Sequence, residues 1–261
     1  MASSIEFLGL LAIAFVPTVL GAISGIGGGI IIKPVLDAVS SFDTEEINFL
    51  SGCTVLAMSF VTLFKDRIGK IKLDDKRGTI LAMGTVFGGS AGKFIFLTII
   101  SGAQGELVRS IQTLILILLC FAVLLYIIKK DSIKQLEVNN LFVCFLLGIT
   151  LGIISAFIGI GGGPINIMVI SYFLGMDSKT AGRYSIYAVF LAQAASLGST
   201  IISGRVPIHL FPALIVMVIG GISGGFIGSL IKRKLKNNQV DIFFRFILTG
   251  VIIILAINLV R

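Results

Sequence analysis

The sequence Gly-Ile-Gly-Gly-Gly occurs at residues 25–29 and again at residues 159–163. Each copy interrupts an apolar segment, 5–38 or 138–175, that is much longer than the ~20 residues of one helical membrane crossing. Glycine inside a helix costs roughly 1 kcal/mol relative to alanine, so three in a row predict a break in helical hydrogen bonding. We therefore expect each long segment to be two helices joined at the glycines.

The composition indicates a protein surrounded by lipid. Of its 261 residues 56% are hydrophobic and 13% are charged, and the mean hydropathy is +1.07. A soluble domain carries about 25% charged residues, so this composition predicts an all-α polytopic membrane protein. The net charge of +8 comes from short basic patches between apolar runs, which is typical of cytoplasmic loops and not of nucleic-acid binding.

An internal repeat divides the chain into halves at 1–134 and 135–261. The glycine motifs pair at an offset of 134 residues, which also pairs Ser51 with Ser185. Each half is predicted to hold one glycine-broken hairpin and three simple helices, within a single integral membrane domain. The simple helices are expected at 45–64, 78–100, 107–128, 178–202, 207–231 and 240–260.

The positions of Lys and Arg indicate how the long segments cross. If both cross once, 11 basic residues lie on one side and 8 on the other. If each turns at its glycines and returns, the split is 16 against 3, with Lys33 and Lys93 left in the membrane. The second arrangement predicts two inverted repeats, with residues 40–44 and 175–179 on opposite faces. It also predicts a multi-pass protein of the inner (plasma) membrane with both termini outside the cytoplasm.

These motifs resemble a known family. The doubled glycine motif, Pro164 directly after its second copy, the basic loop at 65–77 and the total length are similar to the sulfite exporter TauE/SafE family. The resemblance covers nearly the whole chain. It implies movement of sulfite, sulfoacetate, thiosulfate or related sulfur-containing anions, which is a substrate class and not one ligand.

The glycine breaks are the predicted substrate site. The return helix of each hairpin begins at or just after its glycines, and a helix N-terminus carries free N–H donors and partial positive charge that suit an anion. Inverted hairpins would bring two such N-termini together near the middle of the membrane. The alternative is that the glycines only permit close helix packing.

The predicted substrate-binding residues are the motif glycines together with cationic, amide and hydroxyl side chains close to them in the sequence or in the repeat. Each of these residue types also has an alternative role. Lys33 and Lys93 could extend their ammonium groups to the membrane interface, and Asn166 could cap the turn. The hydroxyl groups could form hydrogen bonds within their own helices. Asn48 and Gln193 are further polar candidates. The predicted set is Gly27, Gly28, Gly29, Lys33, Ser51, Thr54, Lys93, Gly161, Gly162, Gly163, Asn166, Tyr184 and Ser185.

The sequence thus predicts a secondary carrier or uniporter for a small inorganic or organic sulfur-containing anion, with an anion channel of the same architecture as the alternative. We expect no enzyme activity, because His209 is the one histidine and the acidic residues lie at segment ends. We expect no cofactor and no metal. The expected partners are the anion and the lipid bilayer, without nucleic acid, and a homodimer stays open.

Overall fold

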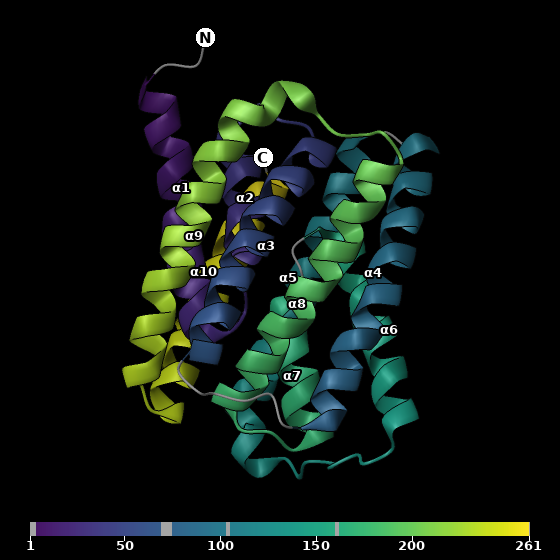
Figure 1. The fold of residues 1–261 in the computed structure, drawn as a ribbon, viewed down its shortest axis with the longest axis vertical. Coiled ribbons are helices and arrows are strands. Elements are labelled where there is room, and N and C mark those ends of the chain that lie inside the picture. The colour runs from purple at the N-terminus through teal and green to yellow at the C-terminus, as the bar shows by residue number, and fades with distance from the viewer. Residues whose placement is uncertain (1–3, 69–74, 103–104, 160–161, 261) are drawn as a thin grey trace.

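The protein is a bundle of helices that run along one common axis (Figure 1). The computed structural model describes residues 4–68, 75–102, 105–159 and 162–260. Within these ranges the chain forms ten α-helices and two 3-10 helices, and no strand. The α-helices are α1 (Ser4–Ser24), α2 (Gly29–Val39), α3 (Thr44–Ile68), α4 (Lys76–Gly102), α5 (Gly105–Lys129), α6 (Leu141–Ile158), α7 (Gly163–Leu174), α8 (Ser178–Ile202), α9 (Phe211–Lys234) and α10 (Asn237–Val260).

Length and composition make the bundle a multi-pass membrane protein, as predicted. Seven helices of the described chain are apolar and long enough to cross a membrane: α1, α3, α5, α6, α8, α9 and α10. The predicted crossing 78–100 falls within α4, which has 27 residues. By contrast, α2 and α7 have 11 and 12 residues, too few to span ~30 Å of hydrocarbon.

Both long apolar segments are broken at their glycines, which confirms the predicted hairpins. The chain between α1 and α2 turns at Gly25 and Gly27, each with a φ of +85°. The chain between α6 and α7 turns at Gly159 and Gly162, with φ values of +75° and +68°. Only glycine adopts such positive φ angles without a steric penalty, so the motif itself produces the two turns.

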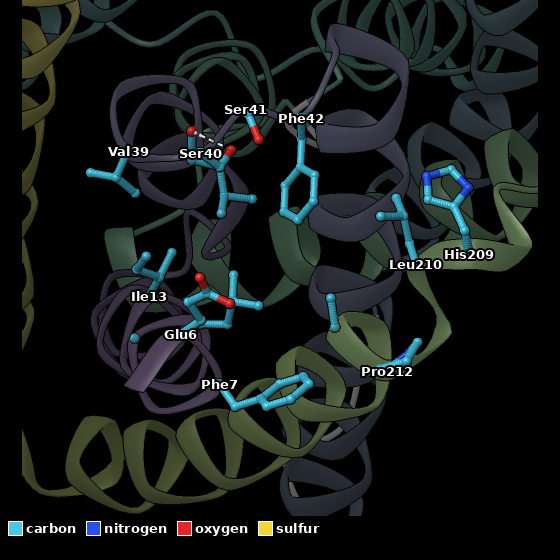
Figure 2. A pocket seen from close by; sticks show the side chains of 14 residues that line it. Glu6, Phe7, Ile13, Val39, Ser40, Ser41, Phe42, His209, Leu210 and Pro212 are labelled. Atoms are coloured by element: carbon cyan, nitrogen blue, oxygen red, sulfur yellow. Dashed lines mark hydrogen bonds between the residues drawn. The ribbon is translucent and has the colours of Figure 1, made fainter. Parts of the chain in front are cut away.

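Each hairpin returns to the end of the bundle where it began. The start of α1 and the end of α2 line one cavity of about 640 Å³, together with Phe42 and the start of α9 (Figure 2). Around the second hairpin, the Leu136 N–H donates to the Tyr172 carbonyl over 3.0 Å, which joins the chain before α6 to the end of α7. In each hairpin a short second helix, α2 or α7, therefore turns back inside the bundle beside a longer first helix, α1 or α6.

The two hairpins open at opposite ends of the bundle (Figure 1). The first opens at the end that holds both chain termini, which we call the terminal end. The second opens at the end that holds Lys130, Lys179 and the last turn of α9, which we call the basic end; there Lys130 bonds to Ser178 and Asp241. Residues 40–43 therefore lie at the terminal end, and 175–177 lie at the basic end. A two-fold relation between the halves stays a prediction.

The halves interlock through their glycine-rich helices. Helix α6 packs along α4, and α1 packs along α9, so each hairpin leans on the opposite half. A Cβ added at Gly88 of α4 would lie 2.1 Å from the Ile149 carbonyl oxygen, and one at Gly220 of α9 would lie 2.8 Å from the Ala14 Cβ. Gly88 and Gly220 lie 132 residues apart, close to the offset of 134 between the glycine motifs, and both allow close helix packing.

Candidate functional site

The two glycine breaks touch each other inside the bundle. A Cβ added at Gly163, the first residue of α7, would lie 1.4 Å from the carbonyl oxygen of Ile26 in the first break. Such overlap means that the backbone of one break rests directly on the helix start of the other. Two segments 137 residues apart in the sequence, Ile26 and Gly163, therefore form one feature at the centre of the candidate site.

The first break presents main-chain donors in a buried place. Gly28 caps α2 without a side-chain hydrogen bond, and the N–H groups of Gly28, Gly29 and Ile30 donate to no acceptor within the described residues. All three residues are buried. Unpaired N–H groups are costly away from water, so this helix start is suited to an anionic ligand.

The glycines of the first break differ in the space around them. A Cβ at Gly27 would have its nearest neighbours 3.8 Å away, at Val55 and Val189, which is ordinary contact distance. A Cβ at Gly28 would instead lie 2.8 Å from the Thr18 side chain. Gly27 is thus required by its φ angle, whereas Gly28 is required by the close approach of α1 to α2.

The second break carries amide side chains without partners. Asn48 of α3 reaches it: a Cβ at Gly159 would lie 2.2 Å from Asn48 Oδ1. On α7, Asn166 Oδ1 would lie 3.2 Å from a Cβ at Gly162. Both atoms are buried and neither has a hydrogen-bond partner in the part of the chain that the structure describes. The predicted site residue Gly161 lies outside the described residues.

Hydroxyl groups complete the surroundings of the second break. Ser185 Oγ donates to the Gly163 carbonyl oxygen over 3.2 Å, which ties α8 to the start of α7. Ser51 follows Asn48 by three residues, so the two lie on the same face of α3. Ser51 is fully buried and its hydroxyl has no partner among the described residues. Asn48, Ser51 and Asn166 therefore supply unpaired donors and acceptors around one place.

The predicted site residue Lys33 lies at the second break, against the end of α6. It is 3% exposed, and its Nζ donates to Gln112 Oε1 over 2.5 Å and to the Ile158 carbonyl over 2.7 Å. Ile158 is the last residue of α6, where carbonyl groups have no helical partner and attract a cation. The ammonium group of Lys33 is therefore buried at the edge of the second break and does not snorkel to the interface. It ties the first hairpin to the second.

Lys93 lies at the level of the second break but close to other charges. Gly92, its neighbour on α4, packs on the end of α6, because a Cβ there would lie 2.5 Å from the Ile153 carbonyl oxygen. Lys93 is 5% exposed, and the charges that act on it are those of Glu45 and Arg205. These two residues belong to the terminal-end side of the bundle.

Two predicted site residues have local structural roles. The Thr54 hydroxyl donates to the Leu50 carbonyl of its own helix over 2.7 Å, which is the alternative that the sequence left open. Tyr184 packs its ring against Gly78 and exchanges hydrogen bonds with the main chain of Asp75 at the basic end. Neither contact involves a glycine break.

Sequence reasoning missed two residues at this site. Gln112 of α5 is 1% exposed, accepts from Lys33 and donates from Nε2 to the Phe157 carbonyl over 2.5 Å. Ser155 of α6 would have its Oγ 1.7 Å from a Cβ at Gly162. Gln112 was detectable as a lone amide in an apolar segment. Ser155 carried no signal, because serine is ordinary in membrane helices.

Metal chemistry has no visible ligand set in the described chain. Within those residues, no group of three or more His, Cys, Asp or Glu side chains is placed to hold a metal ion. The three cysteines are free, and Cys120 and Cys144 pack in the apolar core. The arrangement that remains is one of neutral donors and buried lysines, which suits binding of an anion.

Comparisons with known proteins identify the family. The sulfite exporter TauE/SafE family matches residues 10–259, which confirms the resemblance. "Probable membrane transporter protein YunE" of Bacillus subtilis is 24% identical over 93% of this chain and 94% of its own length. "Probable membrane transporter protein MJ0441" of Methanocaldococcus jannaschii is 24% identical over 92% and 91%, respectively. No solved structure matches the chain. The chain therefore belongs to the sulfite exporter TauE/SafE family of membrane transporters.

Proposed function

We propose that this protein is a secondary carrier or uniporter for a small sulfur-containing anion, such as sulfite, sulfoacetate or thiosulfate. The observation that carries the proposal is the group of buried, unpaired polar atoms where the glycine breaks meet. Asn48, Ser51 and Asn166 supply side-chain atoms, and the start of α2 supplies main-chain N–H groups. The family supports transport. The donors in this group, which are Asn48 Nδ2, the Ser51 hydroxyl and the main-chain N–H groups, support the choice of an oxyanion.

The geometry supports an oxyanion for a physical reason. Several oxygens on one small ion can accept several hydrogen bonds at once, and a helix N-terminus adds partial positive charge. Inside a membrane-spanning bundle, donors without partners cost several kcal/mol each, so a ligand that pairs with them binds favourably. Release of the anion requires that binding is not too strong. Neutral amides and hydroxyls bind an anion more weakly than a ring of arginines, so they favour its release.

The distribution of Lys and Arg between the two ends favours one orientation of the protein in the membrane. The basic end holds Lys130, Lys179 and Lys232, whereas the terminal end holds few basic residues. The positive-inside tendency then places the basic end in the cytoplasm and both termini outside it. Labelling a cysteine at Ser41 and one at Asn238 with a membrane-impermeant reagent tests this. We expect Ser41→Cys to react from outside in intact cells and Asn238→Cys only after lysis.

Transport is tested with purified protein in proteoliposomes, with and without a proton gradient. The panel is sulfite, thiosulfate, sulfate, sulfoacetate and chloride. We expect the sulfur-containing anions to move faster than chloride, and substrate on the far side to accelerate exchange, which a channel does not show. Equal fluxes for all five anions would overturn the proposed selectivity. Flux without acceleration by substrate on the far side would indicate a channel.

Variants connect the flux to the site. Asn48→Ala and Asn166→Ala each remove an amide at the second break, and we expect each to raise the KM by about tenfold, since ~1.4 kcal/mol is tenfold in affinity. The matched control is Asn238→Ala, which removes an exposed amide at the start of α10. If all three variants transport like the wild type, the site does not lie between the breaks.

A further inference from the structure

A second cationic position lies on the basic-end side of the first break. Lys232 stands in the last turn of α9, followed by the exposed Arg233 and Lys234. Unlike them it is 5% exposed, and its Nζ has no hydrogen-bond partner among the described residues. A buried ammonium group without a partner is expensive in any protein interior and more so in a membrane.

The Lys232 ammonium points at the first break. A Cβ added at Gly182 of α8 would lie 3.2 Å from Lys232 Nζ, and 3.3 Å from both the Gly25 Cα and the Ser24 carbonyl oxygen. Because residue 182 has no side chain, the Lys232 ammonium, the end of α1 and α8 approach one another closely there. The ammonium group therefore lies directly beside the first glycine break.

Lys232 shares this place with two further charged residues. Asp66 at the end of α3 and Arg183 of α8 are the strongest charges that act on it, and Lys179 and Asp177 act more weakly. The Arg183 side chain has no hydrogen bond within the described part of the chain. Arg233 also acts on Asp66, so cations outnumber carboxylates in this cluster. Among the described residues, none of Lys232, Arg183 and Asp66 forms an ion pair. The cluster has an excess of positive charge beside a candidate anion pathway.

We propose that Lys232 and Arg183 form a second oxyanion subsite, between the first break and the basic end, and that Asp66 competes with the anion for the Lys232 ammonium. This inference rests on the proposed function. An anion leaving the breaks toward the basic end would meet two cations that form no ion pair within the described residues and have Asp66 as a charged neighbour. Asp66 would limit the affinity, so that the anion is released and not trapped.

The competition predicts opposite effects for two neutralising substitutions. Lys232→Gln removes the cation, so oxyanion affinity should fall at least tenfold. Asp66→Asn removes the competitor, so affinity should rise severalfold. A merely structural role for the cluster would make both substitutions harmful. Lys234→Gln, two residues from Lys232 and exposed, is the matched control and should bind like the wild type.

Binding of radiolabelled thiosulfate to detergent-purified protein, measured by equilibrium dialysis without any flux, gives the test. Lys232→Arg keeps the charge and should bind within a fewfold of the wild type, which separates lost binding from lost folding. Wild-type affinity in Lys232→Gln, or weaker binding in Asp66→Asn, would overturn the subsite while leaving the transporter intact. Wild-type protein that binds neither thiosulfate nor sulfite would overturn the proposed function itself.

Discussion

Both glycine breaks turn through glycines with positive φ angles, but different contacts hold the two breaks in place. At the second break, the last carbonyl of α6 accepts a hydrogen bond from Lys33, Ser185 bonds to Gly163, and Asn48 packs on Gly159. At the first break, the end of α1 also faces a buried lysine, Lys232, but that lysine makes no hydrogen bond within the described chain. Side chains from other helices hold the second break, whereas main-chain hydrogen bonds to Gly21 and close backbone contacts hold the first.

This difference indicates that the two hairpins have different roles. The second break is the rigid partner, because its neighbours are bonded to it and Gly163 rests against the first break. The first break has ordinary contact distances around Gly27 and an unpaired charge beside it. A carrier needs a fixed part that positions the substrate and a part that rearranges. The first hairpin fits the rearranging part.

The largest expected effect comes from adding one methyl group at each break. Gly163→Ala places a Cβ 1.4 Å from the Ile26 carbonyl oxygen, which is main chain and can move only if the hairpins separate. A displacement of ~1 Å can cost about 100-fold in a positioned site, so flux should nearly vanish. Gly27→Ala makes only ordinary van der Waals contacts but strains a φ of +85°, by about 1–2 kcal/mol. It should fold less stably and keep much of its flux.

Flux and the midpoint of thermal unfolding, Tm, are measured for both variants, and Gly9→Ala serves as the control because a Cβ there meets nothing within 4 Å. The comparison between the breaks fails if Gly27→Ala loses more transport than Gly163→Ala.

The next largest effect distinguishes two of the buried lysines, Lys33 and Lys232. Lys33→Met removes hydrogen bonds to Gln112 and to the end of α6 and leaves both acceptors unpaired inside the bundle. Hydrogen bonds to charged groups contribute about 1.5–3 kcal/mol, so Tm should fall clearly. Lys232→Met removes a buried ammonium group that makes no hydrogen bond among the described residues, so Tm should hold or rise. A fall of Tm in Lys232→Met as large as in Lys33→Met would show that both lysines are structural.

The fold was largely predictable, because two local signals determine it. Runs of glycine inside segments too long for one crossing predict hairpins, and the distribution of Lys and Arg predicts on which side each hairpin returns. Both signals are short-range in sequence and depend on the physics of the bilayer. The interlocking of α1 with α9 and of α6 with α4 was not predictable, although the repeated glycines at Gly88 and Gly220 marked the surfaces involved.

The site was less predictable, because its contacts join residues far apart in sequence. Lys33 was assigned to the anion for its position one turn after Gly29, but its bond goes to Ile158, 125 residues away. Tyr184 was grouped with its neighbour Ser185, yet its hydroxyl bonds to Asp75, 109 residues away. A side chain's partner depends on tertiary packing that periodicity does not report. The helix breaks at the motif glycines were predicted correctly, because a glycine acts there through its own backbone.

A smaller effect separates two hydroxyls on α3. Ser51 has an unpaired buried hydroxyl beside Asn48, whereas the Thr54 hydroxyl is bonded to Leu50 of its own helix. Ser51→Ala should raise the KM for the transported anion by about fivefold, which corresponds to a hydrogen bond of ~1 kcal/mol. Thr54→Val should leave the KM unchanged. A KM rise in Thr54→Val alone would move the site away from the second break and toward α9.

The smallest expected effect is on the thermal stability of the protein at acidic pH. It concerns an ion pair at the basic end, beside the second hairpin. Arg77 forms an ion pair with Asp75 at 2.7 Å, and its hydrogen bonds hold the pKa of that carboxyl below its usual range. Because the folded-state pKa lies below the unfolded value of about 3.9, this pair stabilises the fold above that pH and is lost as the pH falls through the folded-state value. Asp75→Asn should therefore flatten the decline of Tm below about pH 4.

The Asp75 carboxyl is partly exposed to solvent, so the stabilisation is small. Tyr184 bonds to the main chain of Asp75, which Asp75→Asn retains, so flux at neutral pH should match the wild type. Tyr184→Phe provides the contrast: it should lower Tm slightly at every pH and keep the acid-dependent decline. If Asp75→Asn instead shows the full decline, the acid-sensitive group lies elsewhere, and the charged cluster of Asp66 and Lys232 beside the first break becomes the next to titrate.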